Sequence, residues 1–154
     1  AFILHDAEEA IVQHRWMLSH RHIFEDKYPR LKPLFKYLSS LDTQSFVIAA
    51  MEEFVILILC TCYVFIQGNY CMEIWSALFI AFSFHQLVHI IQAIILQSYV
   101  PGLITSVLLL PYSYLGMQSI WYAMSGVELL LWGVAGIIFM AINLIFAHWI
   151  GKTL

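Results

Sequence analysis

Long stretches of apolar residues, separated by short polar links, occupy the chain from about residue 46 onward. A bilayer core is crossed by a helix of about 20 mostly apolar residues, so this pattern predicts transmembrane helices. We expect them at residues 46–66, 74–97, 103–123 and 127–150. The short links allow only antiparallel neighbours, which predicts an all-α, polytopic transmembrane helical bundle. Pro111 predicts a kink in the third helix, because neighbouring helices can satisfy the backbone groups that a proline frees.

The first 45 residues follow a different pattern, in which apolar and charged positions mix freely. Residues 1–24 are predicted to form a helix that is too polar to cross a membrane alone. Two interpretations stay open for it. It is either an amphipathic, interfacial or re-entrant helix packed on the bundle, or the inner part of a span that starts before Ala1. Residues 25–45, which include Pro29 and Pro33, are expected to form a polar, basic link to the first span.

Composition agrees with a membrane protein. Of the 154 residues 62% are apolar and 11% are charged, whereas a soluble domain has about 45–50% apolar and about 25% charged residues. The length fits a single membrane domain over residues 1–154, with the lipid bilayer as its surroundings. The chain carries few basic residues and no basic tract, which argues against nucleic acid as a partner.

The distribution of basic residues predicts an orientation. All Lys and Arg residues except Lys152 lie between Arg15 and Lys36, and basic segments stay on the cytoplasmic face of a membrane. Four crossings from that face return the C-terminus, with Lys152, to the same side. We therefore expect the basic link and the C-terminus to be cytoplasmic.

Ionisable and amide side chains interrupt the apolar spans, although each ionisable group in hydrocarbon costs about 2.5–3.5 kcal/mol. At about 1.5 Å of rise per residue, most of them lie within about 18 Å of the cytoplasmic ends of their helices. This pattern predicts a polar layer in the cytoplasmic half of the bundle. The residues are Glu52, Glu53, His85, His89, Glu128, Asn143 and His148, of which Glu128 belongs to the opposite end.

Two spacings along the chain are typical of metal ligands. His85 and His89 are four positions apart and project from one helix face, and Glu8 and Glu9 lie three and four positions after His5. Imidazole and carboxylate together favour zinc, iron or manganese. We therefore predict a divalent transition metal, zinc or iron. Its predicted ligands are His5, Glu9, His85, His89, Glu52 and His148.

Each of these residues also has a structural interpretation. His148 alone fits a hydrogen-bonded packing residue, and the His85/His89 pair fits a polar clasp between helices. Glu52 and Glu53 could pair with the basic link instead of a metal. A haem held between His89 and His148 is a further, less favoured interpretation.

Short motifs along the chain point to a known family. Residues 5–9 read HDAEE and are followed by Trp16, while residues 99–105 read YVPGLIT and follow His89. With the closing segment HWIGK, residues 148–152, these pieces resemble the HXXEE family of bacterial integral membrane proteins. The resemblance implies a bacterial cytoplasmic membrane and a protein of unknown function.

The same resemblance implies an active site built from His, Glu and Asn residues. Carried over by position, its candidate residues here are His5, Glu8, Glu9 and His89. The family tends to place Asn one turn before the middle His, and here that position is His85. This departure adds a strong ligand to the chain.

We favour a metal-dependent membrane enzyme as the function. By analogy with HxxEH zinc enzymes, His5 and Glu9 would bind the metal and Glu8 would be the catalytic base that activates water. Alternatively, the same carboxylates with Glu52 could hold two irons for oxidative chemistry, as in ferritin-like bundles. A substrate that reaches this depth from the bilayer would be apolar or lipid-like.

The alternative from another class is a non-catalytic small membrane subunit. Its polar layer would hold the helices together and bind a partner protein, a pigment or a quinone, or support a homo-oligomer. Ion or proton transport is less favoured, because it needs polar groups in both halves of the membrane and only Glu128 and Ser125 serve the outer half.

Overall fold

The computed structural model describes residues 1–153, and these residues are almost entirely helical with no strand among them. The all-α fold class predicted from the sequence is confirmed. The helices are α1 (Phe2–Lys27), the 3-10 turn η1 (Pro29–Leu31), α2 (Lys32–Leu38), α3 (Thr43–Phe65), α4 (Cys71–Leu96), α5 (Leu103–Ala123) and α6 (Gly126–Thr153).

Four of these helices, α3, α4, α5 and α6, are long and apolar enough to cross a membrane. An α-helix satisfies most of its backbone hydrogen bonds within itself, which is the requirement that hydrocarbon imposes on a spanning segment. Their outward faces carry large apolar side chains such as Phe65, Leu108 and Ile145, all highly exposed in the isolated chain. The protein is therefore a polytopic transmembrane helical bundle, and α5 continues through Pro111.

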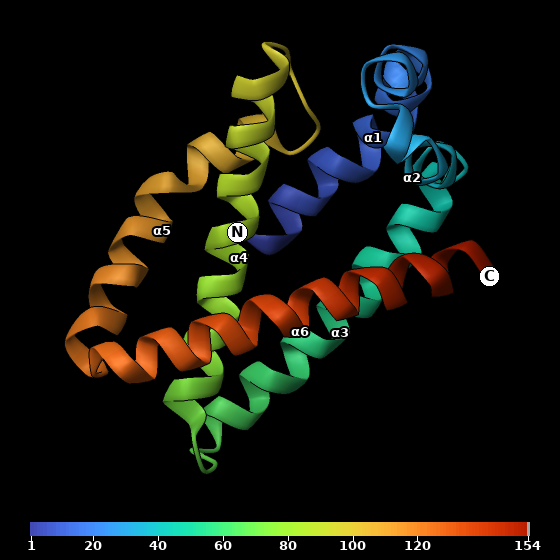
Figure 1. Ribbon diagram of the computed structural model, residues 1–154. Helices are drawn as coiled ribbons and strands as arrows, with labels where there is room; N and C mark the ends of the chain where they lie inside the picture. The colour runs from blue at the N-terminus through green and yellow to red at the C-terminus, as the bar shows by residue number, and fades with distance from the viewer. Residues whose placement is uncertain (154) are drawn as a thin grey trace.

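Helix α4 is the centre of the bundle. It packs against α6 on one side and α5 on another, while α3 runs alongside α6 (Figure 1). The α4–α6 crossing is close enough that a Cβ atom added at Gly136 would collide with the carbonyl oxygen of Ala77. Small residues allow this kind of backbone approach between membrane helices, where van der Waals packing provides much of the attraction.

The segment before the first span is more ordered than a polar link. Residues 28–42 include η1 and α2, and Pro29 and Pro33 lie at the first turns of these two helices. A proline is tolerated there because the first N–H groups of a helix have no partner within the helix. Asp42 then caps α3 by accepting a hydrogen bond of 2.8 Å from the backbone N–H of Ser45.

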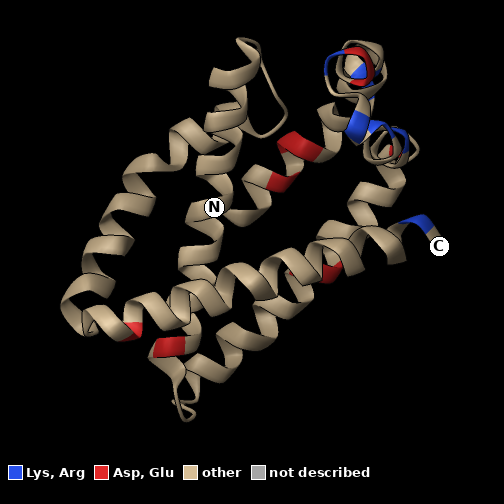
Figure 2. Ribbon diagram, viewed as in Figure 1, with Lys and Arg blue, Asp and Glu red and all other residues tan. Residues whose placement is uncertain are grey.

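The basic residues gather at one end of the bundle. Figure 2 shows Lys and Arg on the second half of α1, on the η1–α2 segment and at the C-terminal end of α6. The Lys152 ammonium donates a hydrogen bond of 2.8 Å to the Ser40 hydroxyl, which joins the end of α6 to the segment before α3. The structure thus places the two basic regions on the same side, as four crossings require.

Candidate metal centre

The first turns of α1 are anchored among the spans by aromatic packing. The Phe2 ring stacks on Phe54 of α3 with centroids 6.1 Å apart, and it lies 6.4 Å from Phe82 of α4. The next inward residue on this face, His5, is completely buried. Helix α1 therefore delivers its polar motif to the interior, which a residue count along the chain cannot show.

Four ligand atoms, one each from His5, Glu9, His85 and His89, lie within 4.8 Å of one another. The Nε2 atoms of His85 and His89 are 3.0 Å apart, and Glu9 oxygens lie 3.6 and 3.2 Å from them. Ligands of a tetrahedral zinc ion with bonds of about 2.0–2.2 Å are about 3.3–3.6 Å apart. The group could therefore hold a single metal ion with small adjustments of its side chains.

The protonation of His5 follows from the hydrogen bonds of Thr105. The Thr105 hydroxyl has one proton, and Glu8 Oε2, a carboxylate oxygen that can only accept, lies 2.6 Å away. The hydroxyl therefore donates to Glu8 and accepts from His5 Nδ1, which is 3.0 Å away. We assign the proton of His5 to Nδ1, which leaves the lone pair on Nε2. That atom is buried and has no hydrogen-bond partner among the described residues, so it is free to bind a metal.

Glu8 lies outside this group, although the sequence suggested it as the catalytic base. Its carboxylate accepts hydrogen bonds from the Tyr99 hydroxyl at 2.7 Å, from the backbone N–H groups of Ile104 and Thr105 at 3.2 and 2.8 Å, and from the Thr105 hydroxyl. The two N–H groups belong to the first turn of α5, where a negative charge is favourable. Glu8 thus fastens α1 to the start of α5 and orients His5 through Thr105, a role typical of outer-shell carboxylates.

The turn between α4 and α5 packs directly on the imidazoles. Gly102 has φ of +79°, a conformation that side chains other than glycine adopt with strain. A Cβ atom at this position would lie 3.0 Å from His5 Cε1 and 3.1 Å from His89 Nδ1. The YVPGLIT motif therefore supplies a tight turn whose backbone covers two of the four group members.

Burial and neighbouring charges set the electrostatics of the α1 residues. Burial is the main reason that the pKa of His5 falls from 6.5 to about 4, so the ring is neutral at pH 7 and suited to metal binding. Burial alone would raise the pKa of Glu9, but His85, His89 and His5 outweigh it and hold that pKa below its ordinary value. Burial, with the negative charge of Glu9, raises the pKa of Asp6 to about 8.

Hydrogen bonds also control the ionisation of Glu8. Burial works to raise its pKa, but the hydrogen bonds from Thr105, Tyr99 and Ile104 outweigh it and lower that pKa. In turn, burial and the hydrogen bond to Glu8 raise the pKa of the Tyr99 hydroxyl. The indole N–H of Trp16 donates a hydrogen bond of 2.8 Å to the Tyr99 carbonyl and holds this segment against α1.

The structure does not bring the remaining two predicted ligands into the group. Glu52 accepts a hydrogen bond of 3.2 Å from the Asn143 amide, which links α3 to α6. His148 Nδ1 lies 2.7 Å from the carbonyl oxygen of Leu144 on its own helix, and its ring meets the edge of Phe46. His148 therefore has a hydrogen-bonded packing role, as its alternative interpretation supposed, whereas Glu52 pairs with an amide of α6 rather than with the basic link.

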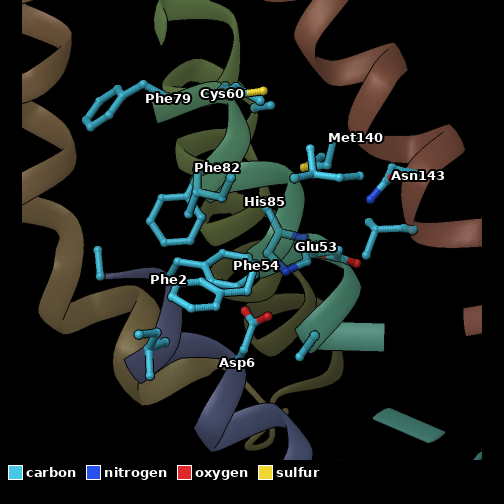
Figure 3. A pocket seen from close by; sticks show the side chains of 18 of the residues that line it. Phe2, Asp6, Glu53, Phe54, Cys60, Phe79, Phe82, His85, Met140 and Asn143 are labelled. Carbon is cyan, nitrogen blue, oxygen red and sulfur yellow. The ribbon is translucent and has the colours of Figure 1, made fainter. Parts of the chain in front are cut away.

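Two carboxyl side chains that the sequence did not single out as site residues also face the interior. Asp6, inside the HDAEE motif, and Glu53 line one cavity with Glu9 and His85. The cavity has a volume of about 400 Å³ and lies among α1, α3, α4 and α6. Figure 3 shows Asp6, Glu53 and His85 beside the rings of Phe2 and other aromatic residues that line it. The sequence signal for Asp6 is its position one residue after His5, a predicted ligand. The direction in which the Asp6 side chain points, however, depends on how α1 packs on the spans.

The chain resembles a known protein family by its sequence. A family model described as "Protein of unknown function with HXXEE motif" matches residues 1–116, about three quarters of the chain. No curated protein and no solved structure matches this chain. The matched region holds all four members of the group and the whole of residues 99–105, and it ends within α5.

Proposed function

This chain belongs to the HXXEE family of unknown function, and we propose that it is a metal-dependent enzyme acting within the membrane on a lipid-like substrate. The observation that carries the proposal is the convergence of His5, Glu9, His85 and His89 from two separate helices. Buried ionisable groups inside a membrane bundle are costly and are usually functional. Three imidazoles and a carboxylate favour zinc or iron as the ion.

The residues would divide the work in the following way. His5, His85 and His89 would hold the ion through three nitrogen atoms, the number of protein ligands that leaves a fourth position open in catalytic zinc sites. When bound, the ion would polarise a carbonyl group and bring the pKa of a coordinated water to about 7. Glu9 would complete the set as a ligand or accept a proton at its carboxylate, which the neighbouring histidines keep ionised by lowering its pKa. These properties support hydrolysis as the reaction class.

This division differs from the sequence-based hypothesis in the identity of the base. All the hydrogen bonds that Glu8 accepts come from residues 99–105, so its oxygens are occupied away from the group. We therefore propose that Glu8 is a positioning residue and that Glu9 handles the proton. Oxidative chemistry at two irons is less supported, because Glu52 pairs with Asn143 instead.

The surroundings of the site support a lipid-like substrate and access from the basic side. The 400 Å³ cavity reaches the group from within the bundle and is lined mostly by apolar side chains. A second hollow, of about 770 Å³, shares Glu9 and His85 with it and includes Tyr37 and Trp149 near the basic end. We propose that this end faces the cytoplasm of a bacterium, because the basic residues gather there.

Metal content of the purified protein tests the proposal. We expect about one tightly held zinc or iron ion per chain in detergent-purified protein, and loss of that ion in His5→Ala and His89→Ala. His148→Ala is the matched control, because His148 lies outside the group and bonds to its own helix. Full metal occupancy in His5→Ala or His89→Ala, with correct insertion, would refute the metal centre.

A non-catalytic membrane subunit is the second candidate, and one observation favours it. The group offers four protein ligands, and four protein ligands are typical of closed structural metal sites. Cobalt substitution separates the candidates, because its visible spectrum reports the coordination of the ion. An open position that binds azide supports the enzyme, whereas a four-ligand site indifferent to azide supports the subunit.

A further inference from the structure

The cavity among α1, α3, α4 and α6 is divided along its length into a polar and an apolar part. The polar part is formed by Asp6, Glu53, Asn143 and His148 together with two of the proposed metal ligands, Glu9 and His85. Apart from Cys60 and Thr61, the side chains farther along α3 and α4 are apolar, and several are aromatic. They include Leu57, Val64, Trp75, Leu78, Phe79 and Phe82. A site of this kind matches a ligand with one polar end and one long apolar end.

The apolar part is long enough for a chain of defined length. From His85 to Trp75 the lining follows α4 for about 15 Å, and from Glu53 to Val64 it follows α3 for about 16 Å, at about 1.5 Å per residue. An extended alkyl chain with bonds of about 1.5 Å advances about 1.25 Å per carbon, so this length accommodates about twelve carbons. Trp75 marks the far end.

The charges at the polar end restrict the head group. Asp6, Glu9 and Glu53 contribute three carboxyl groups, and no Lys or Arg is among the described residues that line the cavity. In the metal-free protein a carboxylate or phosphate head would meet no Lys or Arg side chain to pair with, and an unpaired charge in such a site is costly. A neutral or cationic head can instead exchange hydrogen bonds with the carboxyl and imidazole groups.

We propose that this cavity binds one single-chain amphiphile whose head group carries no negative charge. The head lies beside Asp6, Glu53 and His85, and the chain runs between α3 and α4 toward Trp75. The inference rests on the proposed function, for which it names the substrate class, because this placement brings the head group next to the metal ligands.

Fluorescence quenching tests the occupant directly. Dodecanol brominated at its terminal carbon would bring the heavy atom to Trp75, and we expect saturable quenching of protein in bilayer nanodiscs. Trp75→Phe should remove that component, while the other four of the five tryptophans report non-specific partitioning. In protein stripped of metal by a chelator, the matching brominated dodecanoate, at a pH where it is ionised, should bind at least about tenfold more weakly. Equal binding of the two probes would overturn the head-group assignment.

Two pairs of neighbouring residues provide matched variants. Cys60 lines the cavity and Cys62 is exposed, so Cys60→Phe should weaken dodecanol binding by about tenfold while Cys62→Phe leaves it unchanged. Glu53 lines the cavity and Glu52 does not. Glu53→Gln should therefore reduce the ratio of dodecanol affinity to dodecanoate affinity, and Glu52→Gln should leave that ratio unchanged.

The outcomes separate this inference from the proposed function. Quenching that persists in Trp75→Phe, or that Cys60→Phe leaves unchanged, overturns the inference even when the protein holds its metal. Conversely, saturable quenching in a protein that holds no metal supports the amphiphile site and refutes the metal-dependent enzyme. Should Cys60→Phe fail to insert, the Trp75→Phe comparison on the otherwise unchanged chain still decides the result.

Discussion

At the scale of single residues, the Thr105 hydroxyl is the link between two parts of the site. It donates its one proton to Glu8 and accepts from His5 Nδ1, so the lone pair of His5 Nε2 faces the group. Hydrogen bonds of this kind fix the tautomer and direction of a ligating histidine. The hydroxyl, rather than the bulk of Thr105, carries this function.

Replacing Thr105 tests that role. Thr105→Val keeps the shape but removes the acceptor for His5, so we expect metal affinity to fall by about 10–100-fold. Thr105→Ser restores the hydroxyl and should restore most of the affinity. Competition with a chelator of known affinity measures the change, and Thr153→Val, at the exposed end of α6, is the control. Equal affinity in Thr105→Val and the control would contradict the assigned tautomer.

Glu8→Gln distinguishes a positioning residue from a base. If Glu8 orients His5 through Thr105, removal of its charge weakens the hydrogen bonds that hold Thr105 and α5 and reduces metal affinity. If Glu8 were instead a catalytic base without contact to a metal ligand, Glu8→Gln would lower only the turnover and leave metal affinity unchanged. We expect the first result, measured by chelator competition alongside hydrolysis of a long-chain ester.

At the scale of elements, the site depends on how one turn packs on two helices. The turn between α4 and α5 presents the backbone of Gly102 to His5 and His89, and it presents the first N–H groups of α5 to Glu8. Helix α1 thereby joins α4 and α5 through side chains of its first turns. The HDAEE and YVPGLIT motifs are therefore two halves of one contact.

Gly102→Ala should disturb this contact. The positive φ and the 3.0 Å approach to His5 Cε1 predict a loss of about 1–3 kcal/mol in the free energy of unfolding, with weaker metal binding. Gly126→Ala is the matched control, because nothing lies within 4 Å of a Cβ at that position and the change should be neutral or slightly stabilising. Denaturant unfolding in detergent micelles measures both variants. Equal stabilities would contradict the account of this turn.

At the scale of the whole molecule, four crossings put both basic regions at one end. Cys71, at the start of α4, then lies on the opposite face from Lys152, at the end of α6. This arrangement keeps the buried polar group in the half of the bundle nearer the basic end. It also explains why α1 can reach the group from the same side as the basic segment that follows it.

Labelling from the two sides of the membrane tests this topology. In a Cys60→Ser, Cys62→Ser background, we expect a membrane-impermeant maleimide to label Cys71 from one face only and, once Cys71→Ser is added, Lys152→Cys from the other. In bacterial cells Cys71 should react from outside, because the basic end is expected to stay cytoplasmic. Labelling of both positions from the same face would contradict the four-span fold.

Local chemistry along the chain was sufficient to predict the spans and the paired histidines. Apolar length decides whether a helix crosses a bilayer, and a spacing of four residues puts His85 and His89 on one helix face. Both properties belong to one segment at a time. The proposal of zinc or iron likewise rests on residue types, because imidazole and carboxylate ligands favour these ions.

Which residues belong to the site is decided by the packing of separate helices. Glu8 and Glu9 are adjacent in sequence, yet Glu8 accepts hydrogen bonds from α5 and Glu9 faces the histidines. The reason is that neighbouring positions on a helix point about 100° apart. Likewise, Glu52 meets Asn143 while Glu53 lines the cavity. The rotation and docking of α1 and α3 choose between such neighbours, and those depend on contacts between residues far apart in the chain.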